Sequence, residues 1–535
     1  MSDVMEAAHE ALRTYFGYES FRPGQERLVE AILTGRDALG VMPTGAGKSI
    51  CYQVPALMLG GLTLVISPLV ALMGDQVRAL KAAGARPAYL NSTLTPAQQN
   101  TVLKRAAEGW YQIMYVAPER LNDPRFMAFA RAAASPDGVG IPLVAVDEAH
   151  CISQWGQDFR PSYLEITRFV EALPARPVLA AFTATATRRV RQDIVRTLGL
   201  RDYQEVLTGF DRKNLYFGVE KMGQRKKAEW ICAYARAHAR DSGIVYCTTR
   251  AAVEDLAAQL EEALAPLGAH ALGYHAGMPD EVRRQNQAAF IDDRVSVMVA
   301  TNAFGMGIDK PNVRYVIHHG VPESIEAYYQ EAGRAGRDGD PARCYLLWNG
   351  SDFSRRRFLI DRAHEEALAQ EGADASQLAS ARSRKFRLLS TMQSYCEATG
   401  CLHAFIVEYF GERAADPSAS CGACSNCAPK EAVAPQRRAR VDAFLAEGDA
   451  GARNRPGSDP DLFERLRELR LAIAREREWA PYMVASDATL RGMCRRRPHT
   501  TEELLEVSGI GEKKAAEFGE AFLGAIRAYE DEVRA

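Results

Sequence analysis

The chain has 535 residues, of which 47% are apolar and 25% are charged. A chain of this length and composition forms a globular protein with three or four domains. It has no apolar run long enough to span a bilayer and no secretory stretch at the N-terminus, so we expect a cytoplasmic protein. The net charge of −2 excludes a uniformly basic surface, so any nucleic-acid site must be a local basic track. Eleven cysteines in so long a chain do not predict a disulfide scaffold.

Between about residues 36 and 350, short apolar runs alternate with longer segments of helical periodicity. Such runs are typical of parallel strands that are buried on both faces. The first series comprises 38–42, 62–67, 113–116, 143–146 and 178–182, and the second comprises 243–247, 269–274, 295–300, 313–318 and 343–347. Two series predict two successive doubly wound α/β domains, with a junction near residues 208–214. One larger sheet is the alternative.

Beyond residue 350 the pattern becomes helical and basic, and it ends in a cluster of cysteines. A linker rich in Pro, Ala, Gly and Arg follows, and a second helical segment reaches the C-terminus. We therefore predict two α/β domains, a small helical module, a linker and an all-α domain, with bounds 1–209, 210–350, 351–430, 431–460 and 461–535.

A glycine-rich turn follows the first predicted strand and opens a helix. After Met42 it reads Pro43, Thr44, Gly45, Ala46, Gly47, Lys48 and Ser49. The backbone N–H groups of such a turn point at phosphate oxygens, and the positive end of the helix adds to the attraction. Lys48 would reach the β- and γ-phosphates, and the Ser49 hydroxyl would bind Mg²⁺. Met42 stands where the strict P-loop pattern has Gly, so an ordinary glycine-rich turn is the alternative.

A pair of acidic residues, Asp147 and Glu148, follows the strand 143–146 in the sequence DEAH. An acid at this edge of the sheet can hold Mg²⁺, and the next one can orient or deprotonate the attacking water. A solvated acidic strand end is the alternative. In the second domain, Arg334 and Arg337 are spaced by small residues, which lets guanidinium groups approach a phosphate and stabilise charge during γ-phosphoryl transfer.

Aromatic and polar side chains alternate directly after this acidic pair, in the sequence DEAHCISQWGQDFRPSY (147–163). Trp155 and Phe159 can stack on unpaired bases, and Arg160 can contact a phosphate or sense the nucleotide. Gln154 beside them is a further candidate DNA contact. The alternative is a core Trp and Phe beneath a loop, but the polar neighbours argue against full burial.

With this stretch, the chain resembles the superfamily 2 helicases and, within them, the RecQ family of DNA helicases. The resemblance covers roughly residues 10–430 and implies two tandem RecA-like domains with parallel sheets and an ATP site between them. In the family, an aromatic-rich loop couples DNA binding to ATP hydrolysis. A DEAD-box RNA helicase would lack this loop and the cysteine module.

The remaining motifs occur in the family's order. The segment 16–25 resembles the adenine-recognition motif, which implies that Tyr18 stacks on the base, Gln25 reads its amino edge and Arg22 lies nearby. Segments 67–76 and 183–185 resemble the motifs that track the DNA strand and link hydrolysis to domain movement.

In the second domain, segments 246–250 and 300–309 resemble motifs that grip DNA phosphates and complete the ATP site. The resemblance implies DNA contacts from Arg250 and Thr301 and a nucleotide contact from Asp309. Two positions depart from the family: Gln157 stands where His is usual, and Gly74 where Lys is usual. We expect the first to alter the coupling between DNA and hydrolysis, and the second to weaken the grip on the strand.

Cys421, Cys424 and Cys427 have CxxCxxC spacing, and Cys401 precedes them by 19 intervening residues. Four thiolates satisfy a tetrahedral structural Zn²⁺, whose binding would supply folding free energy to a small module. An iron–sulfur cluster is the chemical alternative. The resemblance favours zinc and implies that Cys401, rather than Cys396, is the fourth ligand.

Residues 461–535 resemble an HRDC domain, a small helical DNA-binding accessory. A Gly-Ile-Gly turn opens a helix within 508–522, and its amides can take a DNA phosphate. Arg495–Arg497 and Lys513–Lys514 are further candidate contacts, with a charged face of a helical bundle as the alternative. Most RecQ proteins carry a winged-helix domain of roughly one hundred residues before the HRDC domain. Here Cys427 and Asp461 are separated by 33 residues, so that domain cannot fit.

The resemblance implies a nucleoid-associated, ATP-dependent DNA helicase that moves 3′ to 5′ on single-stranded DNA and unwinds duplex DNA in recombination and repair. Its cofactors would be ATP, Mg²⁺ held by Ser49 and Asp147, and Zn²⁺. We expect a monomer that binds single-stranded and partly duplex DNA, with a single-stranded-DNA-binding protein or other repair proteins as further partners. Because the winged helix is missing, an ATP-gated DNA-binding or strand-annealing protein is the alternative. An RNA helicase is disfavoured by the aromatic loop.

Overall fold

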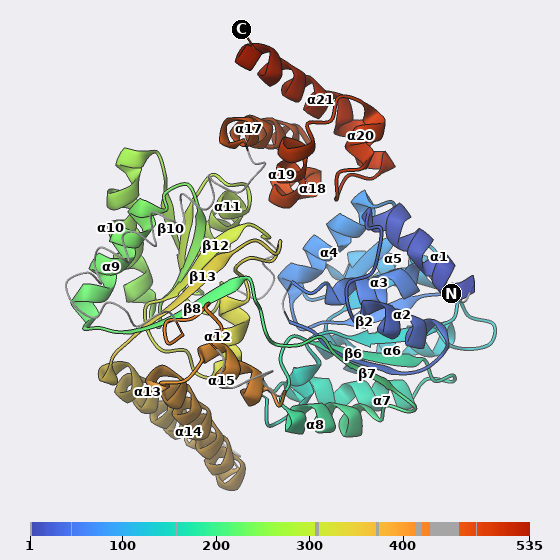
Figure 1. Cartoon of the computed structure of the whole chain (residues 1–535). Helices are drawn as coiled ribbons and strands as arrows, with labels where there is room; N and C mark the ends of the chain where they lie inside the picture. Colours follow the sequence, from blue (N-terminus) through green and yellow to red (C-terminus); the bar gives the residue numbers. More distant parts are fainter. Residues whose placement is uncertain are drawn as a thin grey trace. The chain divides into compact units, whose positions relative to one another are not determined.

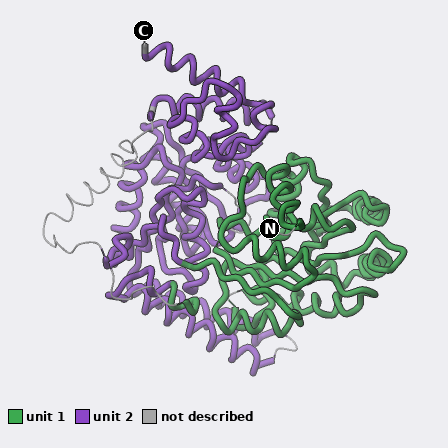
Figure 2. Tube along the Cα trace, turned by 45° about the vertical axis from the view of Figure 1, so that its right-hand side comes forward, with its two compact units in different colours: residues 1–210, 306–308, 407–413 green, residues 211–305, 309–406, 414–535 purple. Residues whose placement is uncertain are grey.

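The computed structural model describes residues 3–43, 45–156, 158–304, 310–370, 374–412, 420–427, 459–477 and 479–534. The chain forms two compact units (Figure 2). The first contains the residues up to Phe210 and a short returning segment at 407–412. The second contains most of the remaining chain. Among the described helices, none combines the length and the apolar character that crossing a membrane requires.

The first unit is built on a seven-stranded sheet of order β3-β4-β2-β5-β6-β1-β7, and all its strand pairs are parallel. The strands are β1 (Ala38–Val41), β2 (Thr63–Ile66), β3 (Pro87–Leu90), β4 (Ile113–Val116), β5 (Leu143–Val146), β6 (Val178–Thr183) and β7 (Gln204–Leu207). The helices are α1 (Asp3–Ala11), α2 (Gln25–Leu33), α3 (Lys48–Met58), α4 (Val70–Ala82), α5 (Pro96–Ala107), α6 (Pro124–Ala133), α7 (Glu165–Glu171) and α8 (Arg188–Leu198) (Figure 1).

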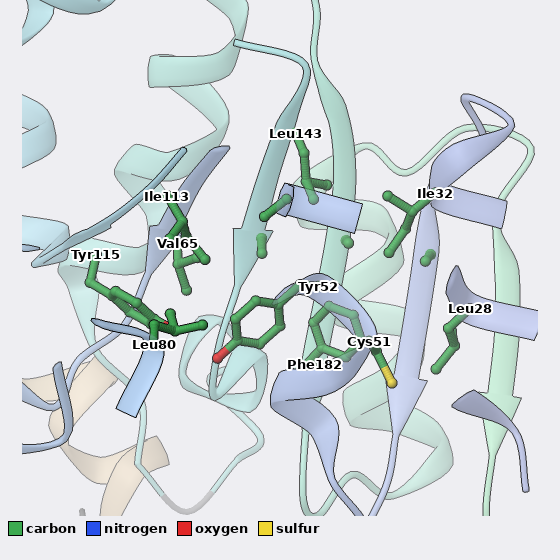
Figure 3. Close-up of a cluster of buried hydrophobic side chains, with 14 of the residues drawn as sticks. Leu28, Ile32, Cys51, Tyr52, Val65, Leu80, Ile113, Tyr115, Leu143 and Phe182 are labelled. Atoms are coloured by element: carbon green, nitrogen blue, oxygen red, sulfur yellow. The ribbon is translucent and has the colours of Figure 1, made fainter. Parts of the chain in front are cut away.

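The core of this unit joins helices α2 and α3 to the sheet (Figure 3). Leu28 and Ile32 from α2 and Tyr52 from α3 pack with residues of the central strands. The rings of Tyr52 and Phe182 lie 5.4 Å apart between centroids. Because the central strands are buried throughout, their apolar runs are continuous rather than alternating.

The second unit contains a six-stranded parallel sheet of order β10-β11-β9-β12-β13-β8. Its strands are β8 (Leu215–Lys221), β9 (Ser242–Tyr246), β10 (Ala271–Tyr274), β11 (Val297–Ala300), β12 (Val313–His318) and β13 (Ala342–Trp348). The accompanying helices are α9 (Gln224–Ala237), α10 (Arg250–Leu264), α11 (Asp280–Ile291) and α12 (Ile325–Ala332). Two separate sheets confirm the prediction of two α/β domains over one larger sheet.

Three strands were not predicted: β3, β7 and β8. All three are edge strands of their sheets. An edge strand is covered less completely, so its sequence carries polar residues or starts with proline and the apolar run is lost.

Beyond β13, the described residues of the second unit are mainly helical. A long pair, α13 (Gly350–Leu368) and α14 (Ala375–Glu397), packs side by side and leads to α15 (Leu402–Tyr409). The C-terminal bundle contains α17 (Pro460–Arg477), α18 (Pro481–Val484), α19 (Asp487–Arg496), α20 (Thr501–Leu505) and α21 (Glu512–Arg534), which enclose an apolar core of their own. The predicted order of α/β, helical module and all-α bundle is therefore correct.

The chain returns to the first unit at the end of α15. The rings of Phe210 and Phe410 stack with centroids 4.2 Å apart and planes 15° from parallel. The backbone N–H of Phe210 donates to Glu412 Oε2 at 3.3 Å. The first unit is thus completed by residues that lie about two hundred positions further along the chain.

Candidate active site

The phosphate loop forms the turn between β1 and α3. Gly45 and Gly47 have φ angles of 86° and 81°, a region that residues with a Cβ rarely adopt. A Cβ on Gly47 would also lie 2.5 Å from Gln25 Nε2, so a side chain there would strain the backbone and displace the Gln25 amide. Lys48 and Ser49 are the first residues of α3, where backbone amides lack helical partners and favour an anion. Thr44 lies outside the described residues.

Gln25 supports the phosphate loop. Its Nε2 donates to the carbonyls of Ala46 and Gly47 at 3.1 and 3.0 Å, and its Oε1 accepts from the Arg22 backbone N–H at 2.8 Å. The Arg22 guanidinium donates to the carbonyl of Gly45. Both ends of the buried Gln25 amide therefore have protein partners. Tyr18 is 47% exposed, as a platform for a base requires.

The acidic pair stands at the carboxyl end of β5, where a parallel sheet places its ligand-binding groups. The backbone N–H of Asp147 donates to the carbonyl of Ile66 at 2.8 Å, and Tyr163 Oη donates to the carbonyl of Asp147 at 2.9 Å. Burial and the adjacent Glu148 raise the pKa of Asp147 to about 6, while the charge of Lys48 lowers it. The structure thus brings Lys48 of the phosphate loop within electrostatic reach of the acids.

The donor set at this edge fits magnesium, which prefers hard oxygen ligands such as carboxylates and hydroxyls. Asp147 offers a carboxylate, and Ser49 offers a hydroxyl one residue from Lys48. A divalent cation would offset the cost of burying Asp147 beside the second carboxylate of Glu148.

His150 connects the acids to the end of β6. Its Nδ1 lies 2.8 Å from Thr183 Oγ1 and 3.2 Å from Glu148 Oε2. The Thr183 hydroxyl donates to the carbonyl of Thr185 at 3.1 Å. Burial alone lowers the pKa of His150, but its interactions with Cys151 and Glu148 raise that pKa to about 10. Sequence reasoning named the DEAH motif and the segment 183–185 but missed this link, which only the pairing of β5 with β6 reveals.

The aromatic loop is neither core nor fully solvated. Gln154 is exposed, and Trp155, Phe159 and Arg160 are half-buried, which excludes the prediction's alternative of a Trp and Phe in the core. Arg160 donates through Nε and Nη2 to Asp158 Oδ2 at 3.1 and 2.9 Å.

The loop is tied to its neighbours on both sides. Arg160 Nη1 donates to the carbonyl of Pro68 at 3.3 Å. Ser153 Oγ donates to Asp193 Oδ2 of α8 at 2.9 Å. The Arg189 guanidinium, also on α8, lies 3.1 Å from the centroid of the Trp155 ring. Neither α8 residue was predicted, because a contact between residues so far apart in the sequence leaves no local pattern.

The arginine motif of the second unit lies in the turn after α12. Arg334 is 9% exposed and Arg337 is half-buried. Gly336 has φ 57°, and a Cβ there would lie 2.5 Å from Asn214 Nδ2, so the turn requires glycine.

Two residues that sequence reasoning missed hold this turn. Arg212 Nη2 donates to the carbonyls of Ala335 and Gly336 at 3.2 and 3.0 Å. Asn214 Nδ2 donates to the carbonyls of Gly336 and Asp340 at 2.8 and 2.9 Å. The turn is therefore fixed by the segment that enters the second unit.

The other predicted residues of the second unit lie at the carboxyl ends of its strands. Arg250 is exposed at the start of α10, where the Thr249 side chain accepts from the Ala252 N–H. Thr301 directly follows β11 and is half-buried. Asp309 lies outside the described residues, as does Gln157 in the first unit.

The four predicted zinc ligands come together. The Sγ atoms of Cys401, Cys421, Cys424 and Cys427 all lie within 4.8 Å of one another. Backbone N–H groups of Ala404 and Ala423 donate to the sulfurs of Cys401 and Cys421 at 3.5 and 3.4 Å. Four sulfurs at this spacing fit a tetrahedral structural Zn²⁺ with no open position. Cys396, the near neighbour in sequence, is not in the cluster.

The cluster adjoins the edge of the second sheet. Phe217 of β8 exchanges backbone hydrogen bonds with Ala423 and Ser425, and Cys424 forms a parallel bridge with Phe217. His403 lies 2.9 Å from Asp211 Oδ1 through Nδ1 and 3.2 Å from the carbonyl of Ala423 through Nε2. Metal at the cluster would therefore order the edge of this sheet.

The predicted DNA-contacting residues of the C-terminal bundle fall into two groups, those paired within the bundle and the others. Arg496 pairs with Glu506, and Arg497 pairs with Asp459 and Glu530, so these two cations stabilise the bundle itself. Arg495 and Lys513 are exposed, and Lys514 is half-buried.

Comparison with known proteins finds similarity over nearly the whole chain. Four family models match: DEAD/DEAH box helicase over residues 22–194, helicase conserved C-terminal domain over 226–339, RecQ zinc-binding over 350–428 and HRDC domain over 459–526. The ATP-dependent DNA helicase RecQ of Bacillus subtilis (strain 168) is 37% identical over 615 aligned positions, which cover 98% of this chain and 99% of that protein. The chain belongs to the RecQ family of ATP-dependent DNA helicases.

Other relatives extend the comparison. A putative ATP-dependent RNA helicase of Acanthamoeba polyphaga mimivirus is 37% identical and covers 78% of this chain and 71% of its own. The structure of Mycobacterium smegmatis helicase Lhr bound to ssDNA and AMP-PNP is 20% identical, with a TM-score of 0.52 over 73% of this chain and 57% of that one, and it shares the fold.

This chain is shorter than its alignment with the Bacillus subtilis RecQ protein. The alignment with the Bacillus subtilis protein has 615 positions against 535 residues here, so at least 80 of its positions have no counterpart in this chain. The 33 residues between Cys427 and Asp461 leave no room for a winged helix.

Proposed function

We propose that this RecQ helicase moves 3′ to 5′ along single-stranded DNA and separates duplex DNA ahead of it without a winged helix. The observation that carries the proposal is the continuous set of contacts in the first unit. Glu148 contacts His150, the carbonyl of His150 accepts from the Ser153 N–H at 3.1 Å, and Ser153 Oγ accepts from the backbone N–H of the half-buried Trp155 at 3.1 Å. A change at the nucleotide therefore has a direct route to a surface for unpaired bases.

In this proposal, each residue that contacts the nucleotide has a separate role. Lys48 neutralises charge on the β- and γ-phosphates, and Glu148 orients the attacking water. Asp147 and Ser49 would hold Mg²⁺, which would supply positive charge against the phosphates. Arg334 and Arg337 stabilise the charge that develops during transfer. Tyr18 stacks on the adenine, while Gln25 and Arg22 keep the phosphate loop in shape.

We assign single-stranded DNA to the loop and to two residues of the second unit. Trp155 and Phe159 stack on bases, which makes the contact tolerant of sequence. Arg250 and Thr301 hold phosphates, so affinity should fall as salt rises. The zinc cluster has a structural role, and we propose that the protein acts as a monomer.

A strand-displacement assay tests this function. The duplex is offered with a 3′ tail, with a 5′ tail or with blunt ends, and the protein is loaded with zinc. We expect ATP-dependent displacement from the 3′-tailed duplex and little from the other two. Displacement that needs the 5′ tail would contradict the proposed 3′ to 5′ direction of movement. No displacement from any of the three substrates would contradict unwinding and favour a DNA-stimulated ATPase that anneals strands.

The same preparation separates DNA from RNA. ATP turnover is measured with single-stranded DNA and with RNA of the same sequence, for the wild type and for Trp155→Ala. We expect DNA to stimulate more strongly and Trp155→Ala to lose most of that stimulation while binding nucleotide normally. Stimulation by RNA alone would instead indicate an RNA helicase, the activity given in the name of the mimivirus relative.

A further inference from the structure

The Trp155 ring already has a partner on one face. The Cζ atom of Arg189 lies 3.1 Å from the ring centroid, so the guanidinium lies over one face of the ring, the surface on which a base would stack. Arg189 is an exposed residue in the first turn of α8. The cation therefore reaches Trp155 from the solvent side of its helix.

A second contact fixes the loop to the same helix. Ser153 Oγ donates to Asp193 Oδ2, one helical turn beyond Arg189, and also accepts from the Trp155 backbone N–H at 3.1 Å. The side chain and the backbone of Trp155 are thus both connected to α8. This pairing sets the direction in which the ring faces.

Helix α8 starts close to the hydrolysis machinery. Thr187 caps it by accepting from the Val190 N–H, and Thr185 lies two residues before that cap. Thr183, at the end of β6, contacts His150 of the DEAH motif. A shift at Thr183–Thr185 on hydrolysis would therefore move Arg189 as part of a rigid helix.

We propose that Arg189 is a positioning residue that holds Trp155 against α8 when no DNA is bound, and that an unpaired base takes its place on the ring. The inference rests on the proposed function, in which Trp155 receives a base. A base can therefore stack on this face of Trp155 only after the contact with Arg189 is broken.

The relative strengths of the two contacts allow the exchange. A cation on an aromatic ring at an exposed site is a weak contact, whereas stacking of a base on an aromatic ring is stronger. DNA can therefore displace Arg189. A competing contact in the free protein still reduces the apparent affinity for DNA, because part of the population has the ring occupied.

Trp fluorescence tests the contact without DNA. The protein has five Trp residues, so Trp155 is followed as the difference between each protein and its Trp155→Phe counterpart. We expect Arg189→Ala to raise quenching of Trp155 by acrylamide and Arg189→Lys to restore part of the protection. Arg188→Ala, which removes the neighbouring exposed cation of α8, is the matched control and should behave as the wild type.

DNA-stimulated turnover tests the exchange. We expect Arg189→Ala to lower the single-stranded DNA concentration needed for half-maximal ATPase by about two- to fivefold, the ratio that an exposed cation–π contact corresponds to. Arg189→Lys should lie between this variant and the wild type. If Arg189→Ala changes neither the half-maximal DNA concentration nor the quenching of Trp155, the proposal is wrong. A higher half-maximal DNA concentration also overturns the proposal, because Arg189 would then be a DNA contact.

The two parts of the experiment keep this inference apart from the proposed function. If Trp155→Ala keeps full DNA stimulation, the role of the loop as DNA sensor fails. The quenching result for Arg189→Ala would still show whether the guanidinium covers the ring in the free protein.

Discussion

His150 and Thr183 join two adjacent strands of the first sheet at their carboxyl ends, with 2.8 Å between Nδ1 and Oγ1. His150 also lies 3.2 Å from the Glu148 carboxylate. The carboxylate proposed to orient the water therefore shares a partner with the segment that leads into α8. A single substitution can break this link while leaving the phosphate loop intact.

Thr183→Val removes the hydroxyl and keeps the shape of the side chain. We expect nucleotide binding to stay within about twofold of the wild type and DNA-stimulated kcat to fall at least about tenfold, because the hydroxyl loses its contacts with both His150 and Thr185. Steady-state kinetics and nucleotide titration measure the two effects. Thr167→Val removes a hydroxyl that donates to the carbonyl of Thr197, away from the site, and should leave kcat unchanged. Equal kcat for both variants would refute the link.

Lys48→Ala removes the charge proposed to sit on the β- and γ-phosphates. Turnover should fall by at least about a hundredfold, the scale seen when one preorganised charge-stabilising group is lost. Binding of single-stranded DNA, followed by fluorescence anisotropy, should persist because the aromatic loop is untouched. Lys81→Ala, on the exposed end of α4, is the control. Substantial turnover by Lys48→Ala would remove the phosphate loop from the mechanism.

Arg212→Ala removes two hydrogen bonds to the turn that carries Arg334 and Arg337. A loosened turn would still let ATP bind but would place the arginines poorly, so kcat should fall about tenfold with little change in KM. Lys213→Ala, an exposed neighbour, serves as control. A rise in KM at constant kcat would instead assign Arg212 to substrate binding.

Cys424→Ser removes the buried thiol of the cysteine cluster. We expect the bound zinc to fall from one per chain towards none and the melting temperature to drop by more than about 5 °C, since metal binding contributes to folding. Elemental analysis and calorimetry provide the readouts. Cys232→Ser changes a half-buried cysteine outside the cluster and should keep its zinc. Full zinc in Cys424→Ser, or iron in the wild type, would contradict the assignment.

The sequence predicted the parts of the fold that repeat a local pattern. Strands such as β4 and β5 are continuous apolar runs because helices cover both faces of the sheet, and the structure has them at the predicted residues. The edge strand β7, with the sequence QEVL, has no such run and was missed. The cysteines could be grouped because metal geometry restricts their spacing, and the proximity of the four sulfur atoms confirms that grouping.

The parts of the site that could not be predicted all depend on contacts between distant segments. The contacts of the Gln25 amide with two carbonyls of the phosphate loop were not predicted, and its expected contact with adenine stays a prediction. Arg189 and Arg212 look like ordinary surface cations in the sequence. Their roles arise from where α8 and the segment after Phe210 pack, and no local periodicity encodes that.

The stacking of Phe410 on Phe210 limits how this protein can be divided. A polypeptide that stops after β7 lacks the ring that covers Phe210 and the carboxylate that accepts its N–H. Such a fragment would expose an aromatic surface and invite aggregation. The first unit of a growing chain therefore remains unfinished on the ribosome until the residues that follow α15 have emerged, about two hundred positions later.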